Sequence, residues 1–291
     1  MTKKLNYKLA GAIVFCVLLA VFTFLDLPVA KAMYHPDSLF GRFFEIVGTI
    51  PLPFVGVFSC VALIGTAEKR FCLGTIISYV SGGLMLLYSA FYGVLCIAHA
   101  WEATAVPMAV ATVVWFVASI IITKKIVKSG NGEALRKAAI IGVCASFVAT
   151  IGVSVIKGFV SRPRFYALTD PDTQFTYWFQ IMPSLENAGF PSGHSAQSAL
   201  TFFTVFIPTF LNVKNEKQFT KTAMILSAVF TGCVMFSRMV FGMHYATDVL
   251  VGATLSIATM VGVDVVYEKI KSVQLKKVHV NNAVMRENLE M

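Results

Sequence analysis

The sequence predicts an all-α integral membrane protein, built as a helical bundle of about eight transmembrane helices. The first observation is composition: of 291 residues, 57% are hydrophobic and 13% are charged, and the mean hydropathy is +0.74. Soluble domains are much less apolar. The second observation is a series of apolar segments of about 20 residues, the length at which a helix crosses a bilayer with its backbone polar groups satisfied internally.

Eight segments are long and apolar enough for a crossing. In chain order they are 9–30, 50–66, 71–98, 105–123, 138–156, 195–211, 222–239 and 248–266. The first segment is longer than the apolar part of a removable signal peptide and has no small-residue cleavage site in the right place, so we expect it to remain as a helix.

The basic residues predict the orientation of these helices, because lysine and arginine accumulate in cytoplasmic loops. Placing both termini in the cytoplasm puts 18 of the 24 basic residues on that side. They are Lys3, Lys4, Lys8, Lys69, Arg70, Lys124, Lys125, Lys128, Arg136, Lys137, Lys214, Lys217, Lys221, Lys269, Lys271, Lys276, Lys277 and Arg286. The net charge of +9 follows mainly from this bias, so we expect no nucleic-acid partner.

The six cysteines and the one long internal polar stretch carry weaker signals. All the cysteines fall inside apolar segments without metal-ligand spacing, which predicts neither a disulfide nor a metal site. The polar stretch, 157–194, is expected on the outer side. Its aromatic residues fit an interfacial belt and a substrate contact equally well. They are Phe165, Tyr166, Phe175, Tyr177, Trp178 and Phe179.

Three clusters of polar residues fall at helix ends on the same predicted outer face. They are the stretch KGFVSRPRF at 157–165, the Ser-Gly-His run at 192–194, and SRMVFGMHYATD at 237–248. Fixed positive charge comes from Lys157, Arg164 and Arg238, while Ser192 and Gly193 stand where a helix N-terminus offers free N–H donors. Charged groups at membrane depth are costly, so residues that carry them are candidates for a functional role. The combination predicts an oxyanion site suited to phosphate.

Two histidines and a carboxylate complete this site. His244 and Asp248 are four residues apart, so on one helical face the carboxylate would hold the imidazole in one tautomer. That arrangement suits a nucleophile or a base. His194 comes from a different helix and would serve as a general acid to the leaving oxygen.

The three clusters together resemble the type 2 phosphatidic acid phosphatase (PAP2) superfamily, in its membrane lipid phosphatase branch. That family's pattern is Lys, six residues, Arg-Pro; then Pro-Ser-Gly-His; then Ser-Arg, five residues, His, three residues, Asp. The second part matches at 191–194 and the third at 237–248. The first matches at Lys157 and Arg164, although Phe165 stands where the family has proline and an Arg162–Pro163 pair lies two residues earlier. The likeness covers roughly 138–266.

The resemblance implies an organisation and a mechanism. N-terminal transmembrane helices would occupy 1–70, a PAP2-like catalytic core with six helices 71–268, and a cytoplasmic tail 269–291. His244 would attack phosphorus and become a phosphohistidine, Asp248 would support it, and His194 would protonate the leaving group. The phosphoryl oxygens would be bound by Lys157, Arg164, Ser192, Gly193 and Arg238. Neither a metal nor another cofactor is expected.

The expected function is therefore a cell-membrane phosphatase that hydrolyses a lipid phosphate or diphosphate at the extracytoplasmic face. Its substrate would be a prenyl diphosphate or a glycerolipid phosphate. Its other partners would be the lipids of the membrane around it. A phosphotransferase using the same histidine remains an alternative. A transporter is less favoured, because transporters carry ionisable groups near the bilayer midplane and these charges gather at one interface. The sequence does not predict the oligomeric state.

Overall fold

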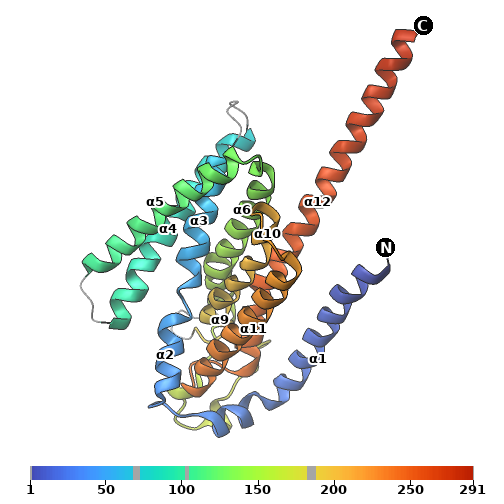
Figure 1. Ribbon diagram of the computed structural model, residues 1–291. Helices are drawn as coiled ribbons and strands as arrows, with labels where there is room; N and C mark the ends of the chain where they lie inside the picture. Colours follow the sequence, from blue (N-terminus) through green and yellow to red (C-terminus); the bar gives the residue numbers. More distant parts are fainter. Residues whose placement is uncertain (1, 68–72, 102–104, 182–187, 291) are drawn as a thin grey trace.

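A computed structural model describes residues 2–67, 73–101, 105–181 and 188–290 of the protein (Figure 1). Over these residues the chain forms helices joined by turns and no strands, which confirms the all-α prediction. The α-helices are α1 (Thr2–Met33), α2 (Leu39–Val47), α3 (Pro51–Gly65), α4 (Leu73–Trp101), α5 (Ala105–Lys128), α6 (Gly132–Phe147), α7 (Val153–Val160), α8 (Pro171–Gln174), α9 (Gly193–Ser198), α10 (Ile207–Phe210), α11 (Glu216–Val240) and α12 (Ala246–Glu290). A π-helical turn, η1 (Val148–Gly152), and two 3₁₀ segments, η2 (Phe165–Ala167) and η3 (Ala199–Phe206), complete the set.

Six helical stretches of the described chain are long and apolar enough to cross a membrane, so the protein is a multi-pass membrane protein. They are Lys8–Met33, Leu39–Gly65, Val110–Lys128, Gly132–Ala167, Glu216–Val240 and Ala246–Lys276. The other two expected segments are also helical. Segment 71–98 lies on α4, apart from residues 71 and 72, which fall outside the described residues. Segment 195–211 is divided among α9, η3 and α10, apart from residue 211, which follows α10. The count of eight crossings stays a prediction.

The core of the bundle forms around α3, which packs against α4, α5 and α6. Most of α3 is buried, including Leu52, Cys60 and Ala62, because helices cover it on several sides. The same hydrophobic cluster continues through Leu200 of η3 to Met260 of α12. Apolar side chains elsewhere, on α1, α4 and α5, stay exposed, as expected of surfaces that face lipid.

Helix α1 stands at the outside of the bundle, and α12 extends past the bundle at its C-terminal end (Figure 1). The apolar stretch of α1 has only 6% of its residues buried. Its buried contacts, Asp26 and Ala30, lie near its C-terminal end, where α12 begins. The polar contact between the two helices is therefore concentrated at one end of the molecule.

Helix α2 was not predicted, because nine residues are too few for a crossing. Ser38 begins it, with the side-chain oxygen accepting the Gly41 N–H at 3.1 Å. Its aromatic residues Phe40 and Phe43 are exposed, whereas Glu45 turns inward and pairs with α11. The helix is therefore amphipathic, with exposed aromatic side chains and an acid that contacts the protein.

Candidate active site

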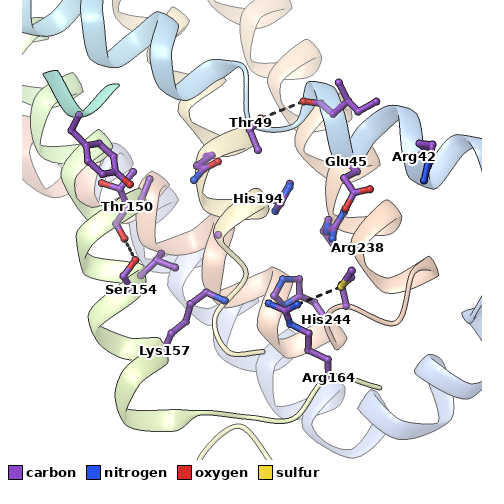
Figure 2. A pocket seen from close by; sticks show the side chains of 17 residues that line it. Arg42, Glu45, Thr49, Thr150, Ser154, Lys157, Arg164, His194, Arg238 and His244 are labelled. Atoms are coloured by element: carbon purple, nitrogen blue, oxygen red, sulfur yellow. Dashed lines mark hydrogen bonds and ion pairs between the residues drawn. The ribbon is translucent and has the colours of Figure 1, made fainter. Parts of the chain in front are cut away.

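A cavity of about 610 Å³ opens among α2, η1, α7, α9 and α11 (Figure 2). Six of the eight predicted site residues line it, from three separate stretches of the chain. They are Lys157, Arg164, Gly193, His194, Arg238 and His244. The other two, Ser192 and Asp248, are fully buried and do not line it. The fold therefore gathers the three sequence clusters at one place.

Cationic side chains dominate the charge of this cavity. Lys157 extends from the last turn of α7 and donates to the Ala188 carbonyl, and Arg238 comes from the last turn of α11. Arg164 follows α7 in an extended segment, and its Nη1 lies 3.7 Å from Met243 Sδ. Figure 2 shows the three side chains directed toward one space. Such a cluster suits a multiply charged anion, because phosphate has several oxygens to share among the donors.

The α2 helix adds charged residues that the sequence motifs did not predict. Arg42 and Glu45 both line the cavity, and Glu45 Oε1 lies 3.0 Å from Arg238 Nη1. The Arg238 side chain is only 3% exposed, so this carboxylate compensates a largely buried charge. An amphipathic helix of nine residues, more than a hundred positions from the motifs, gives no sequence signal for this pairing.

Ser192 organises the start of α9. Its Oγ accepts the Ser195 N–H at 3.3 Å, and its own N–H donates to the Asp248 carbonyl at 2.9 Å. A side chain at Gly252 of α12 would begin 2.3 Å from the Ser192 carbonyl oxygen, so only glycine permits this close approach. The 191–194 turn is thereby held on α12. Direct contact between Ser192 and a phosphoryl oxygen stays a prediction.

His244 stands on the turn between α11 and α12. Gly242 makes this turn with a φ of 62°, a conformation that favours glycine. The His244 Nδ1 lies 2.6 Å from the Gly189 carbonyl oxygen and 3.7 Å from Asp248 Oδ2. Because the carbonyl only accepts, the network assigns the proton to Nδ1 and leaves the Nε2 lone pair free. The nearest orienting group is thus a backbone carbonyl, which no sequence motif reveals.

The two arginines that follow α7 have separate surroundings. Arg164 lines the cavity, whereas Arg162 is 1% exposed and lies behind it. Its Nη1 donates to Asp248 Oδ1 at 2.7 Å, and Asp248 Oδ2 accepts the Tyr245 N–H at 2.8 Å. Asp248 therefore contacts Arg162 more closely than it contacts His244. The sequence did not predict this ion pair.

The surroundings of both cavity histidines favour their neutral form. Burial lowers the pKa of His244 well below its usual value, and Lys157, Arg238 and Arg164 lower it further. Burial likewise lowers the pKa of His194, with Arg238 the next cause. A neutral imidazole at Nε2 suits nucleophilic attack, while a bound phosphate would raise the pKa of His194 and so favour its protonated form.

These shifts predict the pH dependence of catalysis. If His244 is the nucleophile, it must be neutral to attack, and since kcat/KM reports the free enzyme, the acid limb of the kcat/KM profile should be centred below pH 6.5. The measurement is a kcat/KM profile from pH 4.5 to 8, corrected for the substrate's own phosphate titration. An acid limb centred above pH 6.5 after that correction would contradict the assignment.

The six aromatic residues of the 157–194 stretch lie away from the cavity, and some of them pack on the protein while Tyr166 and Phe179 are exposed. Phe175 packs edge-on against Tyr245, with ring centroids 5.3 Å apart, and Trp178 stacks on Phe190 at 5.8 Å. None of the six lines the cavity. Phe175 and Trp178 thus pack against residues next to His244 and Pro191.

No grouping of metal-ligand residues was found in the described part of the chain. Within that part, no three His, Cys, Asp or Glu side chains lie close enough together to hold a metal ion. Four of the cysteines, Cys16, Cys60, Cys144 and Cys233, have free thiols. The charged side chains that line the cavity are four cations and Glu45, beside two histidines, a set whose excess of positive charge suits an anion.

The protein has helices that cross a membrane and a cationic cavity with two histidines. These features indicate a membrane protein whose site suits binding of an anion. The family model of the PAP2 superfamily matches residues 137–271, so this region belongs to the PAP2 superfamily. All eight predicted site residues fall within it, whereas α1 and α2 lie outside. No curated protein and no solved structure matched the chain.

Proposed function

We propose that the protein is a phosphatase that hydrolyses a lipid phosphate or diphosphate at the extracytoplasmic face of the cell membrane. The PAP2 match and the membrane-spanning helices support a membrane phosphatase. The observation that carries the finer proposal is the cavity itself, where His194 and His244 meet the cations Lys157, Arg164 and Arg238.

The reaction would proceed in two displacements. In the first, His244 Nε2 attacks phosphorus, the bond from phosphorus to the leaving oxygen breaks, and His194 gives that oxygen its proton. In the second, water attacks the phosphohistidine, His194 takes the water proton, and inorganic phosphate leaves as the P–N bond breaks. The three cations would stabilise the charge on the equatorial oxygens, the role that metal ions have in other phosphoryl-transfer enzymes.

A lipid substrate fits the position of the cavity. Lys157 and Arg238 lie in the last turns of α7 and α11, and the cavity is therefore at helix ends. A phosphate at headgroup depth could enter while its tail stays in the bilayer. Apolar residues of the cavity wall, Ile46, Ala149 and Val153, would contact the first part of that tail. A soluble sugar phosphate gains nothing from this placement.

A substrate panel tests this proposal. We expect kcat/KM to be highest for a long-chain prenyl diphosphate, lower for phosphatidic acid and lowest for glucose 6-phosphate, all in one detergent. Activity should persist in EDTA, because the cavity supplies cations of its own. Release of inorganic phosphate supports hydrolysis, whereas phosphate appearing on a second lipid would indicate transfer. A clear preference for the sugar phosphate, or rescue by magnesium after complete loss in EDTA, would refute the proposal.

The proposed orientation places both termini and the loop around Gly130 in the cytoplasm. In a cysteine-free background, a cysteine at position 130 should resist an impermeant maleimide in intact cells, and one at Thr173 should react. Residue 130 lies beside Lys125 and Lys128 at the end of α5, and Thr173 lies in the short helix α8, which follows α7. The reverse labelling pattern would contradict the orientation.

A further inference from the structure

A buried ion-pair network behind the cavity joins α1 to the start of α12. Arg162 Nη1 lies 2.7 Å from Asp248 Oδ1, and Arg162 Nη2 lies 3.0 Å from Asp26 Oδ2. All three side chains are 0% exposed. Asp26 lies outside the region matched by the family model, and the reaction described above uses neither Asp26 nor Arg162. Three buried charges cost free energy, so their arrangement requires an explanation.

The N-terminus of α12 explains part of the arrangement. Tyr245 precedes this helix, and a tyrosine side chain cannot cap the first turn as serine or aspartate does. Asp26 of α1 supplies the missing acceptor: its Oδ1 accepts the Thr247 N–H at 2.9 Å, and its Oδ2 accepts the Thr247 hydroxyl. The Asp248 carboxylate accepts the Tyr245 N–H, as the residue at the third helical position (N3) does in a capping box. Carboxylates from two helices thus fix the turn that follows His244.

Arg162 is held firmly between these carboxylates. Its guanidinium lies 3.9 Å from the centroid of the Tyr245 ring and 5.2 Å from that of Phe175, and its Nε donates to the Thr176 carbonyl at 2.8 Å. Two acids therefore share one cation. With both acids ionised, the group keeps one formal negative charge next to His244.

We propose that Asp26 is a positioning residue of the phosphatase site, which shares Arg162 with Asp248 and so leaves the Asp248 carboxylate able to support His244. This inference rests on the proposed function in one respect, that His244 is the nucleophile. It gives α1, through Asp26, a role in supporting the nucleophile His244.

The charges around His244 make this sharing important. Lys157 of α7, Arg164 after it and Arg238 of α11 all disfavour a cationic imidazole, and His194 of α9 is neutral. Glu45 of α2 is paired with Arg238. Attack on phosphorus places positive charge on the His244 ring, and Asp248 of α12 is the acid within 3.7 Å that offsets it. Without the Asp26 charge, Arg162 and Asp248 would form a neutral pair.

The test is Asp26→Asn, which keeps an oxygen for the Thr247 N–H and removes the charge. We expect kcat to fall about 10- to 100-fold, as for other partners that orient an active-site group, with KM changed less than about 3-fold. The matched control is Asp264→Asn, which breaks the 2.7 Å pair with Lys137 much further along α12. The control should keep wild-type kcat.

A second readout does not require turnover. Diethyl pyrocarbonate modifies neutral imidazole, so the pH midpoint of His244 modification, mapped by mass spectrometry, reports its pKa. Asp26→Asn should lower this midpoint by about half a unit or more, and Arg162→Gln should raise it, because the two substitutions remove opposite charges. A purely structural role would move both variants in the same direction.

The outcomes separate this inference from the proposed function. Midpoints for both folded variants equal to the wild-type value, or shifted in the same direction, would overturn the role of Asp26. If wild-type protein released no phosphate from any lipid, the proposed function would fail, yet the opposite shifts would still establish the coupling from Asp26 to His244. If Asp26→Asn does not fold, an unchanged or lowered midpoint in Arg162→Gln overturns the inference and a raised one supports it.

Discussion

Replacing His244 with alanine should abolish turnover, with a loss on the order of 10⁴-fold or more, because the nucleophile of a covalent mechanism has no substitute. Binding of inorganic phosphate should persist, since Lys157, Arg164 and Arg238 remain in the cavity. The measurement is phosphate release by purified protein in detergent, together with a binding titration of inorganic phosphate.

The matched control for this substitution is His35→Ala. His35 is exposed and does not line the cavity, so its loss should leave kcat unchanged. Wild-type turnover by His244→Ala would refute the phosphohistidine mechanism. A loss that His35→Ala shared would point to a general effect of changing a histidine.

Asp248→Asn should lower kcat by about 10²- to 10⁴-fold. Removal of the carboxylate that orients the histidine lowers kcat by up to about 10⁴-fold in other catalytic triads. Both oxygens of Asp248 accept hydrogen bonds, one from Arg162 and one from the Tyr245 N–H. An asparagine can accept only on its single oxygen, so one buried donor loses its partner. That loss should cost about 1–3 kcal/mol in the free energy of unfolding.

The measurements for Asp248→Asn are kcat, affinity for inorganic phosphate and the unfolding midpoint. Phosphate affinity should stay near wild type, because Asp248 does not line the cavity. A variant with wild-type kcat would show that the Gly189 carbonyl alone orients His244. A fall in affinity as large as the fall in kcat would contradict a role confined to orientation.

Hydropathy predicted the helices well because each crossing is a local property of about 20 residues. The apolar stretches on α5, α6, α11 and α12 could be located from composition alone. Helix α2 could not, since it has only nine residues and two of them, Arg42 and Glu45, are charged; it packs on α11. A window designed to find spans does not detect such an element.

The motifs predicted which residues would meet at the cavity, because their spacing within each segment is local and their shared face follows from the helix directions. The partners of those residues were not predictable in the same way. Asp26 and Arg162 are 136 positions apart, and their pairing arises from how α1 packs against α12. The Gly189 carbonyl that contacts His244 belongs to the backbone and has no sequence signature.

The most direct test of the account is to trap the phosphoenzyme. Protein mixed with a ³²P-labelled lipid phosphate and quenched within milliseconds should carry an acid-labile, base-stable label on His244, absent from His244→Ala. His194→Ala should accumulate this label from a substrate with a good leaving group, because hydrolysis of the intermediate lacks its base. A label on another residue, or steady hydrolysis with no label in either protein, would contradict the central claim.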